Sequence, residues 1–332
     1  MKKTLNSLFA VLLILCLAAS LGIPAFAEAG ADSAAEADSS LPIRVITLNG
    51  TTGFGMAGLI ADHEAGKTEL NYSFTVDTDA SNVTAALVNG DCDIAALPTN
   101  AASALYNKTE GKVQVLALNT RGVLYLVTDG SVAVESFADL EGQTVFVPAQ
   151  NPSFIFSYLC KANGVNVTID NTYAQPAELN TAVAAGEVSL AVLPEPMVTV
   201  ARSQNKDLAV ALDLTEEWDK VSEPGSLVQG CVVVRTEFAQ EHPEAVQTFL
   251  KEYEASIAFL SEDPDAAAQM IEEADIFAQA AVAKKAIPNC NICFLAGQDM
   301  ADAMNAFCGL LVEAAPASIG GAVPADDFYF LG

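Results

Sequence analysis

The sequence has few basic residues and very little histidine. It contains 15 lysines and arginines against 42 aspartates and glutamates, which gives a formal net charge of −27. Nucleic acids and anionic membranes bind to basic patches, so we expect no nucleic-acid partner. Its two histidines, His63 and His242, lie far apart in the sequence. Histidine dominates acid–base catalysis and metal binding, so we expect no catalytic residues and no metal site.

Long apolar runs are also missing beyond the N-terminus. Residues 8–21 form one apolar run, which follows Lys2 and Lys3 and precedes the sequence Ala25-Phe26-Ala27. This order is typical of a secretory signal peptide. The run is too short for a transmembrane helix, which needs about 20 residues. We therefore expect residues 1–27 to be a signal peptide cleaved after Ala27, and the protein to be exported to the periplasm or the extracellular face of the membrane.

Residues 28–40 are small, polar and acidic, which is typical of a disordered linker. Such a tether would suit a lipid-anchored protein, and Cys16 is the cysteine that could carry the lipid. Lipid attachment resembles a motif with a small residue before the cysteine, but Leu15 occupies that position. We expect no lipid anchor at Cys16, while the linker leaves membrane attachment open.

The later cysteines include one closely spaced pair, in the sequence Cys290-Asn291-Ile292-Cys293. A C-x-x-C motif can be redox-active, can bind a metal or can form a disulfide. A zinc site needs four ligands, and Cys308 is the one further cysteine nearby. We expect reduced, partly buried thiols, with a structural disulfide as the main alternative.

The pattern of apolar runs predicts two domains. About 305 residues remain after residue 27, more than one core usually holds. From residue 44 to residue 204, strand-like runs alternate with helical patterns, which indicates mostly parallel sheets flanked by helices. After the strand at 231–234 we expect an all-helical tail. Because those helices must cover a sheet, we expect a discontinuous lobe 1 (41–127 plus 232–332), an inserted lobe 2 (128–231) and two crossover strands as a hinge.

Seven segments together resemble a known family. They are residues 49–58 (NGTTGFGMAG), 91–106 (DCDIAALPTNAASALY), 115–128 (VLALNTRGVLYLVT), 137–148 (FADLEGQTVFVP), 190–200 (LAVLPEPMVTV), 238–250 (FAQEHPEAVQTFL) and 320–330 (GGAVPADDFYF). In this order they resemble solute-binding proteins of ABC importers with the type II periplasmic binding fold, in the nitrate/sulfonate/taurine and thiamine-pyrimidine (SsuA/THI5-like) branch. The resemblance implies a two-lobed α/β fold, a small organic ligand held between the lobes, and an ABC permease and ATPase as partners. We expect a monomer.

Polar residues follow several of the expected strands. Ligands of open α/β sheets bind at the carboxyl ends of strands, where helix N-termini offer free N–H groups. The candidate ligand-binding residues are Thr51, Thr52, Gly53, Phe54, Thr99, Asn100, Asn119, Gln150, Asn151, Ser153 and Glu195. An ordinary strand–helix turn or helix cap would use the same residue types, so that alternative stays open for each loop.

Glu195 lies between two prolines at the end of an apolar run. Its carboxylate could bind an amine or a protonated ring nitrogen of a ligand, or hold a neighbouring loop, and the resemblance implies that it faces the cleft. The glycine-rich loop at 50–55 contains no nucleotide fingerprint and no lysine or arginine. We therefore expect no cofactor, and a neutral or cationic ligand is favoured over nitrate or a sulfonate.

Two other classes of protein share this pattern. A ligand-sensing or surface-interaction protein could use the same fold, and biosynthetic enzymes of thiamine-pyrimidine and menaquinone synthesis resemble it. Those enzymes act in the cytoplasm, whereas residues 1–27 predict export. We therefore expect a binding protein and not an enzyme.

Overall fold

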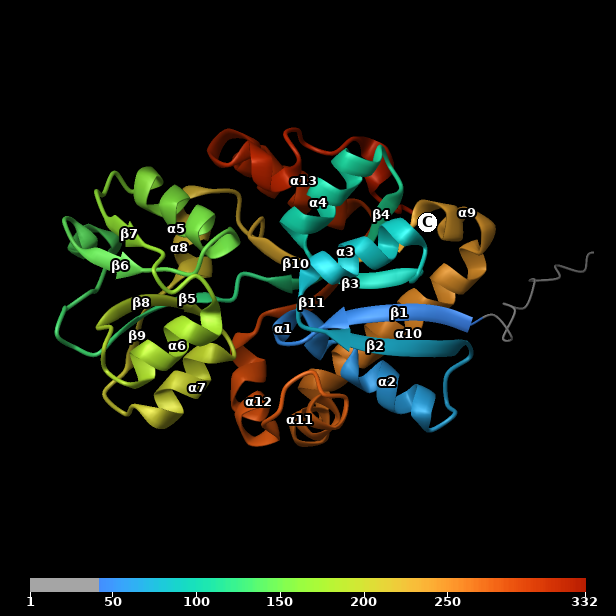
Figure 1. Cartoon of the computed structure of the whole chain (residues 1–332), viewed down its shortest axis with the longest axis horizontal. Coiled ribbons are helices and arrows are strands. Elements are labelled where there is room, and N and C mark those ends of the chain that lie inside the picture. The colour runs from blue at the N-terminus through green and yellow to red at the C-terminus, as the bar shows by residue number, and fades with distance from the viewer. Residues whose placement is uncertain (1–41) are drawn as a thin grey trace, which may run out of the picture. The chain divides into compact units, whose positions relative to one another are not determined.

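The computed structural model describes residues 42–332. The expected signal peptide, linker and Cys16 lie outside this range. The strands are β1 (Pro42–Leu48), β2 (Asn71–Asp77), β3 (Ile94–Pro98), β4 (Val113–Arg121), β5 (Leu124–Thr128), β6 (Thr144–Phe146), β7 (Thr168–Asp170), β8 (Leu190–Pro194), β9 (Ala209–Asp213), β10 (Val228–Arg235) and β11 (Ile292–Ala296). They form two sheets, each flanked by helices, as the sequence predicts (Figure 1).

Helices occupy most of the remaining chain. The α-helices are α1 (Thr51–Phe54), α2 (Ala57–Glu64), α3 (Ala80–Asn89), α4 (Thr99–Thr109), α5 (Asn151–Ala162), α6 (Pro176–Ala184), α7 (Met197–Gln204), α8 (Leu214–Val221), α9 (Thr236–Glu241), α10 (Pro243–Glu262), α11 (Pro264–Glu273), α12 (Ala280–Ala286) and α13 (Gly297–Ala314). Short 3₁₀ turns are η1 (Phe137–Leu140), η2 (Ile287–Asn289), η3 (Pro316–Ile319) and η4 (Asp326–Phe328).

The first sheet has six strands in the order β11-β4-β10-β3-β1-β2. Strands β1, β2, β3 and β4 run in one direction, while β10 and β11 run against them. The mostly parallel arrangement arises because a helix follows each of β1, β2 and β3 and returns the chain to the same end of the sheet. The carboxyl ends of these strands therefore share one edge, which is where ligands bind in such folds.

The second sheet has five strands in the order β7-β6-β8-β5-β9. Strand β5 runs against β8 and β9, and the others run in one direction. The chain leaves the first sheet after β4, enters the second at β5, and returns to the first at β10. Two segments therefore connect the sheets, residues 122–123 and residues 222–227.

Alternate residues along a strand pack into apolar clusters on opposite faces of the sheet. In β10, Cys231 and Val233 enter one apolar cluster, whereas Val232 and Val234 enter another on the opposite face. This follows from the two-residue period of a strand. Helices α2, α10, α11 and α12 cover the second of these clusters. A third cluster lies between the second sheet and helices α6 and α7.

Local sequence signals set several helix ends. The Asp79 side chain accepts a hydrogen bond from the Ser81 N–H at 2.8 Å and caps α3. Gly90 ends the same helix with φ of 75°, a left-handed conformation that glycine adopts without a steric cost. Asp263 caps α11 through the Ala266 N–H. These capping residues lie next to the helix ends they set, so the local sequence fixes where α3 begins and ends and where α11 begins.

One expectation about the chain is wrong, and two elements were not expected. The tail after residue 235 is not all helical, because β11 (Ile292–Ala296) forms the edge of the first sheet beside β4. This strand was missed because it is short and only half-buried, and because it overlaps the C-x-x-C motif at Cys293. The sequence also gave no expectation for β9 and α8, which follow α7 directly. Strand β9 is largely exposed, so it lacks the apolar pattern that marks the other strands.

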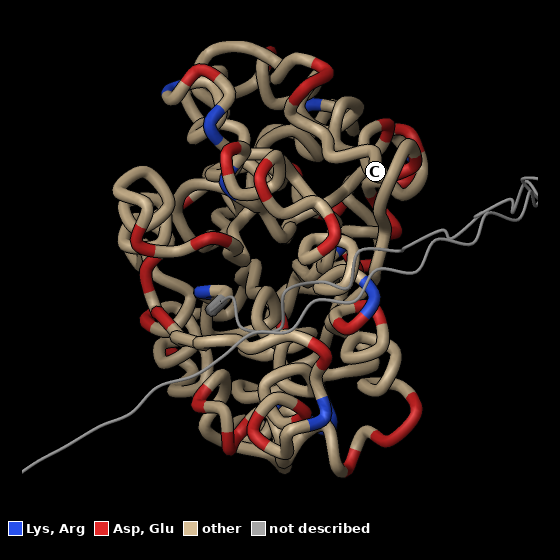
Figure 2. The backbone as a smooth tube through the Cα atoms, turned by 90° about the vertical axis from the view of Figure 1, so that its right-hand side faces the viewer, with Lys and Arg blue, Asp and Glu red and all other residues tan. Residues whose placement is uncertain are grey.

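Acidic residues are spread over the described elements, and basic residues are sparse among them (Figure 2). No helix within residues 42–332 is long and apolar enough to cross a bilayer. The same residues contain no group of three His, Cys, Asp or Glu side chains placed to hold a metal ion. The six cysteines of this range are free, and Cys290 is buried while Cys293 is half-buried.

Candidate functional site

The sequence-predicted residues lie where strands end and helices begin. Helix α1 follows β1, α4 follows β3 directly, α5 follows β6, and Glu195 precedes α7 after β8. All four strands are among those that run parallel within their sheets. Helix N-termini leave unpaired N–H groups, so these positions suit ligands with hydrogen-bond acceptors.

Asn100 and Gln150 line one pocket, although they flank different sheets. The pocket has a volume of about 470 Å³ and is lined by residues of α3, α4, α5 and η3. Asn100 lies in the first turn of α4, and Gln150 precedes α5 with a positive φ of 62°. Phe154, one turn into α5, contributes an apolar wall. The structure thus places two of the predicted residues in the same pocket.

Three buried amides within residues 42–332 have an oxygen without a hydrogen-bond partner. Two of them, Asn100 and Asn151, are predicted site residues, and the third is Asn180 in α6. Asn100 and Asn151 are 8% and 9% exposed, and the Oδ1 atom of each forms no hydrogen bond. Leaving a buried acceptor unpaired costs about 1–3 kcal/mol. Both residues stand in the first turns of helices that follow parallel strands. A ligand N–H or a bound water would satisfy them.

Asn119 has a different role, because its side chain is fully used within the protein. It is buried, and its Nδ2 donates to the Thr52 carbonyl at 3.1 Å and to the Tyr253 hydroxyl at 3.0 Å. Its Oδ1 accepts from the Thr120 hydroxyl at 3.0 Å. Asn119 therefore fixes α1 against β4 and α10, and Thr52 takes part through its backbone. Asn119 has no group left for a ligand in this structure.

Three other predicted residues belong to the packing of the first sheet. The Thr99 hydroxyl donates to the Val228 carbonyl at 2.7 Å, and both atoms are buried. A side chain at Gly53 would place its Cβ 1.9 Å from the Leu48 carbonyl oxygen, so only glycine fits there. Phe54 is completely buried and packs edge-on against Phe277, with ring centroids 6.2 Å apart. In this structure Phe54 has no exposed face for a ligand to stack on.

Thr51 and Ser153 are half-buried at the starts of α1 and α5. The Ser153 hydroxyl accepts a hydrogen bond from Asn171 Nδ2 at 3.3 Å. Both hydroxyls are accessible, and each lies within a few residues of a predicted site residue on the same helix.

Glu195 is a buried carboxyl group. It is 3% exposed and accepts from the Thr199 N–H at 3.1 Å and from the Thr199 hydroxyl at 2.9 Å. Burial raises the pKa of Glu195, although hydrogen bonds from Thr199 and Asn289 and the charge of Arg202 partly oppose that shift. A cation or N–H donor brought close to this buried carboxyl group would stabilise its ionised form.

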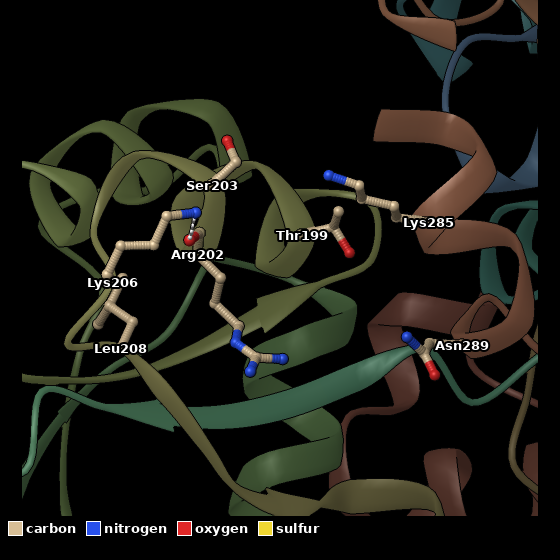
Figure 3. A pocket seen from close by; sticks show the side chains of 7 residues that line it. All are labelled: Thr199, Arg202, Ser203, Lys206, Leu208, Lys285 and Asn289. Atoms are coloured by element: carbon tan, nitrogen blue, oxygen red, sulfur yellow. Dashed lines mark hydrogen bonds between the residues drawn. The ribbon is translucent and has the colours of Figure 1, made fainter. Parts of the chain in front are cut away.

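The predictions missed a pocket next to Glu195. It has a volume of about 330 Å³ and lies between α7 and the segment formed by α12 and η2 (Figure 3). Its lining residues are Thr199, Arg202, Ser203, Lys206, Leu208, Lys285 and Asn289. The first three lie at i, i+3 and i+4 on one face of α7, and this spacing was available in the sequence. The contribution from α12 required the tertiary structure.

The family follows from the sequence match. No curated protein matches the chain. The family model described as NMT1/THI5 like matches residues 67–267, which is more than half of the chain. The chain belongs to the NMT1/THI5-like family. The matched region of this NMT1/THI5-like protein includes Asn100, Asn151 and Glu195, and it ends within α11.

Solved structures share the fold of this NMT1/THI5-like chain. An ABC transporter protein from Parabacteroides distasonis is 24% identical, with a TM-score of 0.75, over 87% of this chain and 98% of its own. The periplasmic aliphatic sulphonate-binding protein SsuA from Escherichia coli is 13% identical, with a TM-score of 0.70, over 87% of this chain and 92% of its own. The ligand-binding component of an ABC-type import system from Staphylococcus aureus, solved with zinc bound, is 15% identical, with a TM-score of 0.66, over 87% and 96%. These likenesses show that the fold is that of periplasmic binding proteins.

Proposed function

We propose that this protein is an extracytoplasmic solute-binding protein that captures a small organic molecule between two lobes and delivers it to an ABC importer. The observation that carries the proposal is the set of buried polar groups at the strand ends of both sheets. Asn100 comes from the first sheet, while Asn151 and Glu195 come from the second. In a protein of this family and fold, such groups serve a ligand rather than the core, because two of them have no partner within the protein.

The chemistry of these groups indicates a ligand rich in hydrogen-bond donors. The unpaired Oδ1 atoms of Asn100 and Asn151 are acceptors, and Glu195 is an acid whose pKa is raised by burial. A ligand with amine, amide or protonated ring nitrogens would satisfy all three. Such a ligand would also restore a low pKa to Glu195, because an opposite charge favours the ionised form. We therefore favour a neutral or cationic nitrogen compound over nitrate or a sulfonate as the ligand.

The mechanism we propose is closure of the two lobes about their two connections. The predicted lobe bounds (41–127 plus 232–332, and 128–231) would move to the two connections, residues 122–123 and 222–227, because β5 lies in the second sheet and β10 in the first. These two connections would form the hinge. The Asn291 side chain donates to the Gly122 carbonyl at 2.6 Å and braces the first connection. Ligand contacts with both lobes would favour the closed state by differential affinity. The closed form would then dock as a monomer on a permease and its ATPase outside the cytoplasm, with no enzymatic step.

The experiment that tests this function is a ligand screen. The purified protein is unfolded and refolded to remove any carried-over ligand, and thermal melts are then recorded against vitamins, pyrimidines, amines, amino acids, sulfonates and nitrate. A ligand at a hundredfold excess over its Kd stabilises the folded state by about 2.7 kcal/mol, which gives a clear shift in Tm. We expect one chemical class to produce such a shift.

The site is then tested by titration calorimetry with the compound that binds. Asn151→Ala and Glu195→Gln should each weaken binding by about tenfold, which corresponds to 1.4 kcal/mol. Gln240→Ala, at an exposed position on α9, serves as the matched control and should leave affinity unchanged. No Tm shift with any compound would count against a solute-binding function. If Asn151→Ala and Glu195→Gln bind the compound as tightly as the control Gln240→Ala does, that result would count against this site.

A further inference from the structure

The structure gathers three basic side chains in a strongly acidic protein. Arg202 from α7, Lys206 two residues beyond the end of α7, and Lys285 from α12 line the 330 Å³ pocket shown in Figure 3. The whole sequence has 15 lysines and arginines and a formal charge of −27. Helix α7 packs against the second sheet and α12 against the first. Positive charge from two separate parts of the fold therefore converges on one place.

The three cations have no acidic partner among residues 42–332. No carboxylate of that range forms an ion pair with any of them, although seven other ion pairs occur there. Lys284, the neighbour of Lys285, shows the contrast: it pairs with Asp265 at 2.5 Å. Basic residues in the last turn of a helix complement its dipole, and that accounts for the residue type at Arg202 and Lys285. It does not account for their facing one another across a pocket.

The pocket offers hydrogen-bond donors in addition to charge. The guanidinium of Arg202 and the ammonium groups of Lys206 and Lys285 are donors only. Asn289 also lines the pocket, but its side chain hydrogen-bonds to Glu195. The Thr199 and Ser203 hydroxyls already donate to Glu195 and to the Val200 carbonyl. Lys206 donates one hydrogen bond to the Arg202 carbonyl at 3.2 Å, which leaves its other N–H groups, the Arg202 guanidinium and the Lys285 ammonium. These groups suit an oxyanion, since charged donors form the strongest hydrogen bonds to phosphate or sulfate oxygens.

We propose that this pocket binds a small, doubly charged oxyanion of the phosphate or sulfate class, which bridges α7 and α12. Without an anion, the cations of the two helices repel each other, and with one bound, both helices are attracted to it. The pocket shares no lining residue with the pocket of Asn100 and Gln150, but it adjoins Glu195 through Thr199 and Asn289. The anion would act as an additional tie between the parts of the fold that carry the two sheets. The affinity is modest, because the basic side chains are exposed and water screens them.

Equilibrium dialysis of the purified protein against radiolabelled inorganic phosphate, at constant ionic strength set with chloride, tests the proposal. We expect saturable binding of one phosphate per chain. Lys206→Gln, just beyond α7, and Lys285→Gln on α12 should each weaken it by about tenfold. Lys284→Gln, one residue from Lys285 and with the same change of charge, should leave it unchanged. Thermal melts of all variants show whether each remains folded.

The outcomes separate the alternatives. Loss of binding in Lys206→Gln but not in Lys285→Gln would overturn the bridging arrangement. Equal weakening in Lys284→Gln and Lys285→Gln would indicate a non-specific charge effect and overturn the site, as would the absence of saturable binding to wild type. Competition of the bound label by sulfate or by glycerol 3-phosphate identifies the source of the oxyanion. Stronger competition by the ester assigns the site to an organic phosphate, and equal or stronger competition by sulfate assigns it to an inorganic anion.

Discussion

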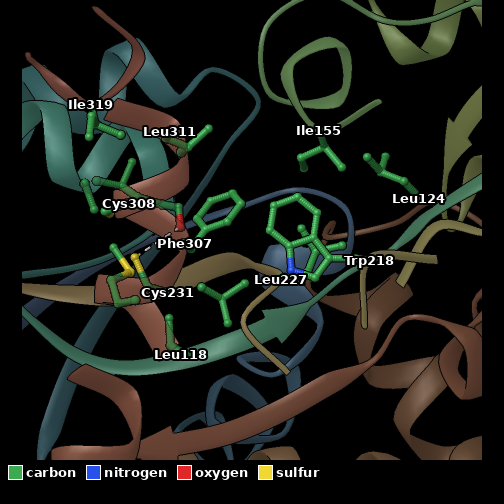
Figure 4. Close-up of a cluster of buried hydrophobic side chains, with 14 of the residues drawn as sticks. Leu118, Leu124, Ile155, Trp218, Leu227, Cys231, Phe307, Cys308, Leu311 and Ile319 are labelled. Carbon is green, nitrogen blue, oxygen red and sulfur yellow. Dashed lines mark hydrogen bonds between the residues drawn. The ribbon is translucent and has the colours of Figure 1, made fainter. Parts of the chain in front are cut away.

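Trp218 and Phe307 lie in contact with their ring centroids 5.8 Å apart, although one belongs to α8 and the other to α13 (Figure 4). Helix α8 contacts strands β5 and β9 of the second sheet, whereas α13 contacts β4, β10 and β11 of the first. The two rings belong to one apolar cluster that contains residues of both sheets. The two parts of the fold are therefore joined by packed side chains in addition to the two connecting segments.

We predict that this contact contributes substantially to stability. Phe307 is completely buried, so Phe307→Ala should lower the free energy of unfolding by about 3–5 kcal/mol through lost burial and a cavity. Urea titration measures this, with the fluorescence of Trp218, the single tryptophan of the sequence, as the signal. Val88→Ala, at a position that is 50% exposed, should change stability by less than about 0.5 kcal/mol. Similar values for the two variants would contradict the prediction.

The raised pKa of Glu195 predicts a pH-dependent effect on stability. An acid whose pKa is higher in the folded state contributes stability that is complete below its unfolded pKa, near 4, and is lost as pH rises through the folded pKa. Without ligand, Glu195→Gln should therefore be more stable than wild type at pH 7.5, and this difference should shrink toward pH 4.

Thermal melts from pH 4 to pH 8 test this effect, with Glu187→Gln at an exposed position as the control. The control should show a small difference that does not follow the same pH range. A stability gap between wild type and Glu195→Gln that grows toward low pH would rule out the assigned cause. The same substitution should weaken ligand binding. The Glu195 carboxylate would therefore lower the stability of the ligand-free protein and strengthen its binding of ligand.

Two glycines should respond in opposite ways to alanine. At Gly53 a Cβ would come 1.9 Å from the Leu48 carbonyl, so Gly53→Ala should destabilise the fold by more than about 2 kcal/mol. At Gly309 in α13 a Cβ meets no atom within 4 Å, so Gly309→Ala should stabilise the protein by about 0.5–1 kcal/mol. Urea titrations of the two variants compare them directly. A tolerated Gly53→Ala would show that α1 can move away from β1.

The buried asparagines should divide into structural and ligand-facing groups. Asn119→Ala removes hydrogen bonds to Thr52 and Tyr253 and should cost about 1–3 kcal/mol of stability. Asn151→Ala removes an unpaired oxygen, so the ligand-free protein should lose little stability or gain some. Melts with and without ligand measure both effects. If Asn151→Ala destabilises the free protein as much as Asn119→Ala does, its amide has a structural partner and not a ligand.

Much of the fold could be predicted from the sequence, because apolar periodicity is local. The alternation of strands and helices between residues 44 and 204 was expected, since apolar patterns and caps such as those of β3 and α3 lie within or next to each element. Strand β11 could not be predicted, because it is a half-buried edge strand whose pairing with β4 joins residues more than 170 positions apart. Strand β9 was missed for a similar reason, since its residues are mostly exposed.

For the candidate site, the sequence by itself determined which residues stand at strand ends and helix starts, because chain order fixes those positions. Only the tertiary structure decided their roles. Asn100 and Asn151 were left unpaired, whereas Asn119 was bonded to Thr52 and Tyr253. The tertiary structure also places Lys285 and Arg202, which are 83 positions apart in the sequence, in the lining of one pocket. The physical reason is that a polar side chain acts on a ligand only where packing has buried it and left it without a partner, and packing depends on residues distant in sequence.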